Sequence, residues 1–99
     1  MADQIVVLKV STGEEIVGRL AEKSDEQMML EKVRSLVMVP GPNPGEVGVQ
    51  LIPFMTSNVD GKLGISISQI VATSAAEDNL ERMYLQQTSG IDLSTSMTG

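Results

Sequence analysis

Carboxylates are the most numerous charged side chains in this chain, and two pairs of them could do chemistry. Glu14-Glu15 and Asp25-Glu26 both fall in segments with turn composition. Acid–base or nucleophilic catalysis would need a partner base or nucleophile beside such a pair, and the chain has no His and no Cys. We therefore expect that the protein is not an enzyme and has no cofactor. We interpret both pairs as solvated carboxylates in turns. A divalent cation at one of these turns remains the alternative.

The basic residues could serve a second kind of chemistry, the binding of phosphates. The net charge of −6 argues against long-range attraction of a single copy to nucleic acid or to an anionic membrane. Several copies in a ring could still gather their cations into one patch. The alternative is that these cations only hydrate the strands and discourage edge aggregation. Six of the seven are Lys9, Arg19, Lys23, Lys32, Arg34 and Lys62.

The length and composition indicate one small domain with a soft core. A chain of 99 residues buries only about two thirds of its unfolded surface. With one Phe, one Tyr and no Trp, the core must be built from Val, Ile, Leu and Met, so oligomerisation would be a natural way to bury more surface. We expect four residues to point inward together: Val7, Leu20, Leu30 and Ile70.

The chain carries no sequence signal for a membrane or for export. No apolar run approaches the roughly 20 residues needed to cross a bilayer. The N-terminus, Met-Ala-Asp-Gln, has no basic segment of the kind that opens a signal peptide. We therefore expect a cytoplasmic protein without a membrane partner.

The first 40 residues have the pattern of three antiparallel strands. β-branched residues fill 5–10, and strands over 15–23 and 28–39 follow after short polar turns. Gly13 supplies the positive φ of a tight hairpin, and Gly18 in mid-strand indicates a bend or the close approach of a neighbour. Basic and uncharged residues alternate over 32–35, which predicts a half-exposed middle for the third strand.

A proline-rich loop separates these strands from the rest. Three prolines within 40–45 stop strand pairing, and the loop over 40–48 is either a functional lip or only a connection. A fourth strand is expected over 47–55, with Pro53 near an edge, and a turn over 58–61. Two short β segments, 65–67 and 70–72, are joined through Ser68-Gln69.

A helix is expected after the strands. Ser74 and Glu77 have the spacing of a capping box, and Gly90 is placed to end the helix. Its narrow apolar stripe, at helical spacing, comprises Leu80, Met83, Tyr84 and Gln87. The predicted organisation is a barrel over 1–74, a helix over 75–90 packed on the barrel or on a neighbouring subunit, and a disordered tail over 91–99.

The pattern of the first strands resembles the first motif of the Sm and LSm family. It consists of Val10-x-x-Gly13, Gly18-x-Leu20, and then Asp25-x-x-Met28 and Leu30, with 65–71 where the shorter second motif would fall. The chain is also similar to small Sm-like proteins of marine T4-like phages, which would place it in the host cytoplasm. The resemblance implies a mostly β fold: a small, strongly bent, five-stranded antiparallel Sm-like (SH3-type) barrel, here with one C-terminal helix. Its edge strands would pair between subunits into a ring, commonly of six or seven copies.

The same resemblance implies a nucleic-acid site. Sm-like rings bind single-stranded RNA, typically uridine-rich, around the pore. Asp25 matches the acidic turn residue of the family, whereas Gln27 replaces an aromatic or His, Met29 replaces an Asn, and Ser66-Ile67 replaces Arg-Gly. Because stacking contributes about 1–3 kcal/mol per base, the loss of the aromatic predicts weak base preference. The expected contacts are Asp25, Gln27, Met29, Ser66, Gln69, Lys32 and Arg34.

Two functions remain open at this point. The first is a homo-oligomeric ring that binds single-stranded RNA or DNA with weak base preference, with a role in nucleic-acid processing. The second is a ring of the same kind used as a protein-interaction or assembly module without nucleic acid. The acidic charge and the C-terminal helix suit the second, and the cations in the barrel suit the first.

Overall fold

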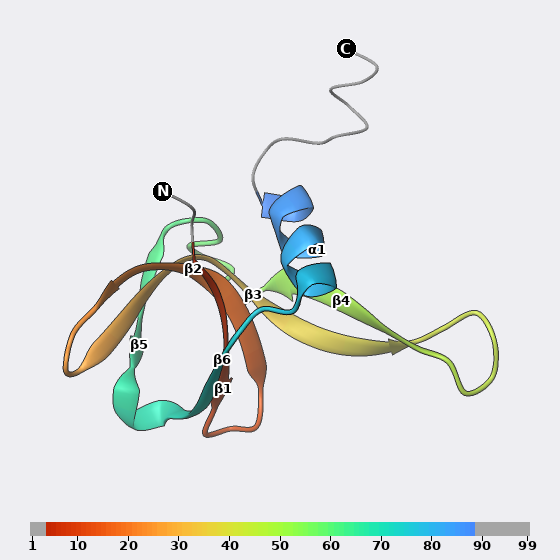
Figure 1. Ribbon diagram of the computed structural model, residues 1–99, viewed down its shortest axis with the longest axis horizontal. Helices are drawn as coiled ribbons and strands as arrows, with labels where there is room; N and C mark the ends of the chain where they lie inside the picture. Colours follow the sequence, from red (N-terminus) through yellow and green to blue (C-terminus); the bar gives the residue numbers. More distant parts are fainter. Residues whose placement is uncertain (1–3, 89–99) are drawn as a thin grey trace, which may run out of the picture.

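A computed structural model describes residues 4–88, which form a bent β-sheet with one α-helix on it (Figure 1). The short 3-10 helix that interrupts the strands is η1. The elements are β1 (Ile5–Val10), β2 (Glu15–Lys23), β3 (Gln27–Pro40), β4 (Val47–Pro53), β5 (Lys62–Ser66), η1 (Ile67–Gln69), β6 (Ile70–Ala75) and α1 (Asp78–Thr88).

The sheet is antiparallel throughout and stays open. Its strand order is β4-β3-β2-β1-β6, and β5 pairs with the first half of β3. Within residues 4–88 no ladder joins β6 back to β4 or β5, so β4 and β6 are outer strands. The mostly β, antiparallel character expected from the sequence is confirmed. The structure has six strands where five were expected. The extra strand arises because η1 separates β5 from β6: β5 pairs with β3, whereas β6 pairs with β1.

The sheet bends at Lys32 in β3. This residue has a φ of 54°, a conformation that side-chain-bearing residues rarely adopt. Before the bend β3 pairs with β5, and after it β3 pairs with β4. Gly18 in β2 lies close to this region, and a Cβ there would sit 3.2 Å from the Cβ of Leu30. The expected close approach at Gly18 is therefore confirmed, as is the positive φ of Gly13, which is 94°.

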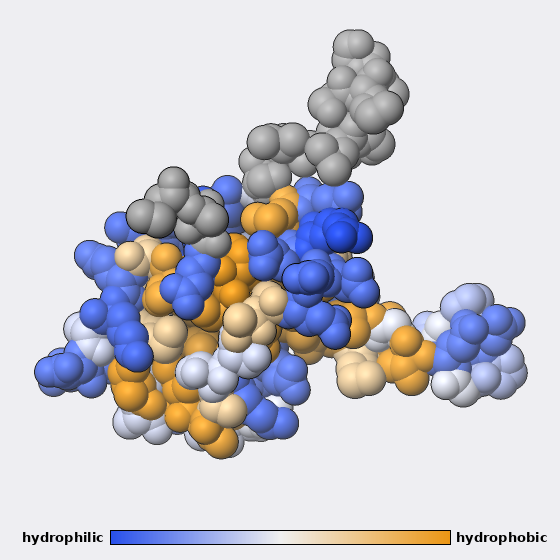
Figure 2. All heavy atoms as spheres, in the orientation of Figure 1, coloured by the Kyte–Doolittle hydropathy of each residue, from blue (hydrophilic) through white to orange (hydrophobic). Residues whose placement is uncertain are grey.

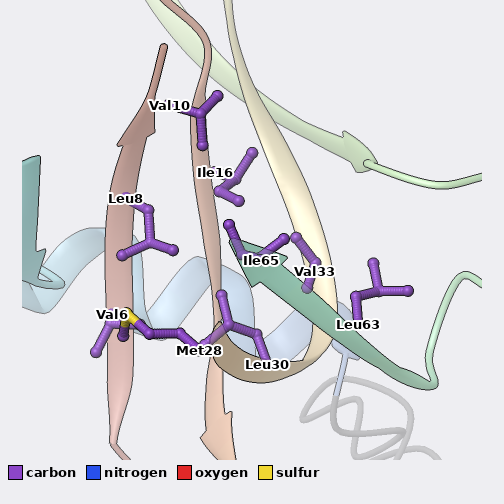
Figure 3. Close-up of a cluster of buried hydrophobic side chains, with 9 residues drawn as sticks. All are labelled: Val6, Leu8, Val10, Ile16, Met28, Leu30, Val33, Leu63 and Ile65. Atoms are coloured by element: carbon purple, nitrogen blue, oxygen red, sulfur yellow. The ribbon is translucent and has the colours of Figure 1, made fainter. Parts of the chain in front are cut away.

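The main core fills the concave side of the bent sheet (Figure 3). Leu30 is fully buried there, as expected, whereas Leu20 and Ile70 lie at its margin and are only partly buried. Val7 was wrongly placed in this core: it packs on the opposite face, because side chains alternate along β1 and Val6 and Leu8 already point inward. The cluster contains Val6, Leu8, Val10, Ile16, Met28, Leu30, Val33, Leu63 and Ile65.

A second, smaller core lies under α1 on the other face of the sheet. Tyr84 is its largest side chain and is 1% exposed. Met83, expected in the apolar stripe, is 38% exposed, and Thr88 is buried in its place. The cluster consists of Ile5, Val17, Leu51 and Tyr84, with Val7, Leu36, Ala76 and Leu80 packed against it.

The helix begins later than the sequence suggested. Ser74 does not cap it, since Ser74 and Ala75 pair with Val7 and Val6 as part of β6, and the Ser74 hydroxyl donates to the carbonyl of Ala75 at 2.8 Å. The β1 ladder therefore outcompetes the capping box. Gly90 and the tail over 91–99 lie outside the described residues. Between residues 4 and 88 the structure contains no helix with the length and apolarity needed to span a bilayer.

Beyond Ser35, β3 loses its β2 partner and continues with β4 alone. These two strands and their loop, residues 36–52, project from the body as a hairpin, which we call the arm (Figure 1). At its tip the Glu46 carboxylate accepts hydrogen bonds from the Asn43 backbone N–H and side-chain amide, at 3.2 and 3.1 Å. β4 ends at Pro53, and the fourth strand is thus two residues shorter than expected.

Candidate functional site

Three solvent-open hollows lie around the turn between β2 and β3. The largest, of about 570 Å³, is called the turn hollow; a second, of about 480 Å³, shares Gln27 with it. A third, of about 290 Å³, lies toward β6 and shares Ile67 with the turn hollow and Lys23 with the second. The turn hollow is lined by Asp25, Glu26, Gln27, Ser66, Ile67 and Ser68.

The turn hollow is held in shape by backbone and hydroxyl contacts. The Ser24 hydroxyl accepts hydrogen bonds from the N–H groups of Glu26 and Gln27, at 3.3 and 3.1 Å, which closes the turn. The N–H of Ile67 donates to the carbonyl of Glu26 at 2.9 Å, which ties η1 to that turn. Short polar side chains in such positions are typical turn formers. The hollow thus lies between two elements that are distant in sequence and fixed to one another.

The structure brings together four of the residues expected at the site. Gln27 and Ser66 are directly opposite one another in the β3–β5 ladder, and Asp25 lies on the same hollow. The Gln27 amide lies over Gly64. A Cβ added to Gly64 would lie 2.9 Å from Oε1 of Gln27. Met29 pairs with Gly64 and lines the second hollow beside Gln27.

Gln69 does not join this group. Its carbonyl oxygen accepts a hydrogen bond from the Ser11 N–H at 2.8 Å, and its side-chain oxygen accepts one from the Ser11 hydroxyl. These contacts connect the end of η1 to the turn between β1 and β2. Gln69 therefore supports the position of η1, and its side-chain oxygen is directed to Ser11.

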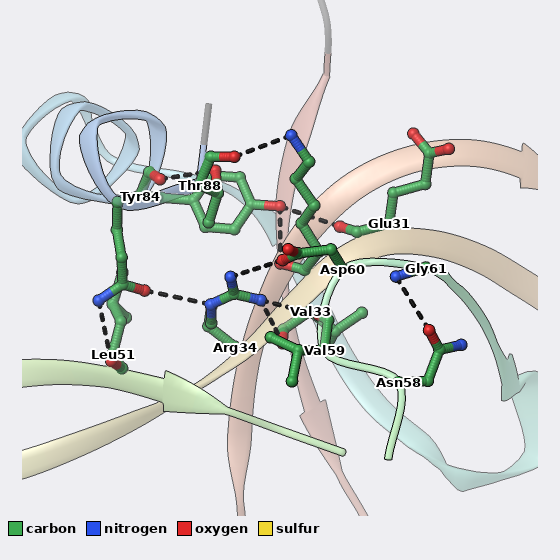
Figure 4. Close-up of polar contacts among 12 residues, drawn as sticks. Glu31, Val33, Arg34, Leu51, Asn58, Val59, Asp60, Gly61, Tyr84 and Thr88 are labelled. Carbon is green, nitrogen blue, oxygen red and sulfur yellow. Dashed lines mark hydrogen bonds and ion pairs between the residues drawn. The ribbon is translucent and has the colours of Figure 1, made fainter. Parts of the chain in front are cut away.

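Arg34 lies apart from the hollows, in a polar network under the C-terminal half of α1 (Figure 4). It is 6% exposed, so the expected half-exposed middle of β3 is wrong at this residue. Its guanidinium donates to the Val59 carbonyl at 2.9 Å, to Asp60 Oδ1 at 2.8 Å and to Gln87 Oε1 at 3.2 Å. The helix and the loop before β5 cover it, and its donors are directed inward.

Lys32 is engaged by the same helix. Its Nζ donates to the carbonyl of Thr88 at 2.8 Å (Figure 4). The other cations divide into two groups. Arg19 forms an ion pair with Glu31 at 2.8 Å, and Lys9 approaches Glu15 at 4.0 Å. Lys23 and Lys62 are exposed and form no ion pair with another residue in the range 4–88.

Lys23 is the cation that belongs to the candidate site. It lines two of the three hollows, although nothing in the sequence analysis distinguished it from the other lysines. Its place as the last residue of β2, directly before the acidic turn, is the signal that could have found it. The site therefore combines one lysine with the carboxylates of Asp25 and Glu26. Over residues 4–88 no three carboxylates come close enough together to hold a metal ion.

No protein-family model matches this chain, and no curated protein matches it.

Proposed function

We propose that this protein assembles into a closed, Sm-like ring of identical subunits and binds single-stranded RNA or DNA with weak base preference at the turn hollow. The observation that carries the ring is the open sheet, whose outer strands β4 and β6 stand at opposite ends of the strand order. An outer strand presents unpaired backbone groups. Pairing β4 of one copy with β6 of the next satisfies both strands, and repetition of one such contact closes into a ring.

The exposed faces of the two outer strands support this assembly. Val71 in β6 is 68% exposed, and Val47 in β4 is 60% exposed. Charges or prolines usually protect such edges, yet no charged residue lies in either strand, and Pro53 stands only at the last position of β4. Burial in a neighbour would stabilise the small domain as well as satisfy its strands.

The proposed mode of nucleic-acid binding follows from the side chains at the hollow. Gln27, Ser66 and Ser68 line the turn hollow and offer hydrogen bonds to sugars and phosphates, and Lys23, which lines the neighbouring second hollow, offers a charge. A ring repeats this lysine once per subunit and so strengthens a weak contact. Without an aromatic group for stacking, and with the Arg34 donors turned inward, most of the affinity would come from the phosphate backbone.

A protein-interaction ring is the second candidate, and one observation favours it. Asp25 and Glu26 bring two carboxylates to the turn hollow, while Lys9, Arg19, Lys32 and Arg34 are all held by groups of the chain itself. A hollow of this charge would also suit a basic segment of another protein.

Light scattering coupled to size exclusion, followed by fluorescence anisotropy, tests the proposal. The expected result is one oligomer of several copies that binds labelled oligo(U), oligo(A) and oligo(dT) with similar affinity, and more weakly as salt rises. Lys23→Gln should weaken binding, whereas Lys62→Gln, which removes another exposed charge outside the three hollows, should change it less.

Each contrary outcome has a distinct meaning. A monomer at micromolar concentration would overturn the ring. An oligomer that binds none of the three oligonucleotides at low salt would overturn nucleic-acid binding and favour the protein-interaction ring. A preference for oligo(U) that survives moderate salt would contradict the argument for weak base preference.

A further inference from the structure

The third hollow, near β6, marks the place where the sheet fails to close, and we call it the seam hollow. Its volume is about 290 Å³, and it is lined by Lys23, Met28, Ile67, Ile70, Val71, Ala72 and Thr73. Met28, Ile67 and Ile70 belong to, or pack against, the main core. The hollow is therefore a mostly apolar opening onto the core, directly beside the edge of β6 that does not pair with β1.

The arm has the opposite character: beyond Leu36 and Leu51, which pack under α1, it is a projecting apolar element without a cover. Residues 35–59 contain one charged residue, Glu46, in a chain that is 20% charged. That carboxylate is used inside the tip, where it binds Asn43. Figure 2 shows hydrophobic surface along the arm between the body and its hydrophilic tip. A two-stranded hairpin is only marginally stable by itself in water, so the arm is an element that another surface should complete.

One face of the outer strand of the arm carries its exposed apolar side chains. Val47 and Val49 are 60% and 41% exposed and share a face with Met38, their neighbour on β3, which is 71% exposed. Gly48 and Gln50, on the opposite face, offer no apolar side chain. Any apolar contact made by the outer half of β4 is therefore made by Val47 and Val49.

We propose that the seam hollow of one copy receives Val47 and Val49 from the arm of the next copy. This inference rests on the proposed ring and names the side chains that hold it together. The occupant is a second copy because the chain carries both halves of the contact, each at an outer strand with one open edge. At about 30 Å³ per water molecule, the hollow has room for about ten waters, which two apolar side chains would displace. The contact would extend the main core across the subunit boundary.

A substitution that fills the hollow tests this proposal with a matched control. Ala72→Phe adds bulk at a residue that lines the seam hollow, and Ala75→Phe adds the same bulk to an exposed alanine of β6 outside it. The dissociation constant between subunits is measured by light scattering over a dilution series, with circular dichroism to confirm folding. Ala72→Phe should raise that constant about tenfold or more, and Ala75→Phe should raise it less.

A second pair of variants approaches the contact from the arm and leaves the hollow untouched. Val47→Thr with Val49→Thr keeps the shape of both side chains and adds two hydroxyls, which the apolar part of the hollow would not satisfy. Ile52→Thr, on the other face of β4 and 40% exposed, is the control. The double variant should again raise the dissociation constant about tenfold, and the control should not.

The possible results separate this inference from the ring itself. If the natural protein is a monomer, both proposals fall. If the natural protein is an oligomer and neither Ala72→Phe nor the double valine variant weakens it more than its control, the ring stands and the seam hollow is not its contact. If Ala72→Phe unfolds the chain, the valine variants alone decide, because their side chains are exposed in a single copy.

Discussion

The hydroxyl of Tyr84 lies 2.9 Å from the carbonyl oxygen of Lys32, the residue at which β3 bends. The same hydroxyl is 2.9 Å from the carbonyl of Glu31, and Lys32 in turn donates from its Nζ to the Thr88 carbonyl at the end of α1. The helix therefore donates a hydrogen bond to the bend through Tyr84, and the bend donates one to the helix through Lys32. Since the arm leaves the body just beyond this bend, the position of α1 bears on the direction of the arm.

Removal of the tyrosine hydroxyl should destabilise the domain. Tyr84→Phe keeps the ring in the second core but leaves two strand carbonyls without this donor, which predicts a loss of about 1–3 kcal/mol. The midpoint of urea unfolding measures the effect. Met83→Leu, a change on the exposed side of the same helix, should stay within about 0.5 kcal/mol. Equal midpoints for the two variants would show that the hydroxyl contact adds nothing to stability.

Stability should fall at alkaline pH because of the same residue. Burial raises the pKa of Tyr84 above its ordinary value of about 10. The folded state therefore holds this proton more tightly than the unfolded state, so the stabilisation is complete below the unfolded pKa and is lost as pH rises through the folded one. Tyrosinate absorbance reports the titration without ambiguity, as the chain has one Tyr. Ionisation below the ordinary pKa in folded protein would contradict the prediction.

The two strand glycines should respond differently to alanine. A Cβ at Gly18 would lie 3.2 Å from Cβ and 3.3 Å from Cδ1 of Leu30, which is fully buried and cannot move aside. Gly18→Ala should therefore cost about 1–3 kcal/mol by overpacking. A Cβ at Gly64 would meet only the end of the exposed Gln27 side chain, which can rotate away, so Gly64→Ala should stay within about 0.5 kcal/mol. Thermal melts of both variants measure the two losses of stability. A loss for Gly64→Ala as large as that for Gly18→Ala would contradict the contact at Gly18.

Truncation of two leucines should rank them by burial. Leu30 is fully buried in the main core, so Leu30→Ala should cost roughly 2–5 kcal/mol. Leu20 packs against the same cluster but is only partly buried, so Leu20→Ala should cost less. Guanidinium unfolding of the two variants gives the order. A larger loss at Leu20 would mean that the register of β2 against β3 differs from Leu20 opposite Leu30.

Arg34 and Asp60 should contribute unequally although they form one ion pair. The Arg34 side chain is 7% exposed and binds groups on two other segments, whereas the Asp60 side chain is 64% exposed. Arg34→Lys keeps the charge but loses the planar fork of donors, which predicts a loss of about 1.5–3 kcal/mol. Asp60→Asn should cost less than about 1 kcal/mol, because water screens an exposed carboxylate. Chemical unfolding of both variants checks the order, and similar losses would assign the stability to the ion pair alone.

Local patterns in the sequence determined the first half of the fold. The strands over 5–10 and 15–23 match β1 and β2, and β3 begins one residue earlier than expected. Alternation along a strand and the turn chemistry around Gly13 act over a few residues, so they can be identified without knowledge of the rest of the chain. The close approach at Gly18 followed from the same kind of local argument.

Where two local structures competed, the tertiary partner decided. Ser74 has the spacing of a helix cap, but β1 offers a ladder to the same residues, and the strand prevails. Alternation likewise predicted a half-exposed Arg34, yet Gln87 and Val59, distant in sequence, cover it. Neither competitor is visible within a short window of sequence.

The candidate site shows the same division between sequence and tertiary structure. The sequence by itself determined the residue types: a Gln and a Met where an aromatic and an Asn would be needed to read a base, and an acidic turn. Only the tertiary structure decided which of them meet, because the β3–β5 register places Gln27 opposite Ser66 while Ser11 holds Gln69 elsewhere. It also decided that Lys32 and Arg34 serve the helix and that Lys23 lines the hollows. The physical reason is that residue type and turn chemistry are local properties, whereas register, burial and the partners of a long cationic side chain depend on segments that meet only in the folded chain.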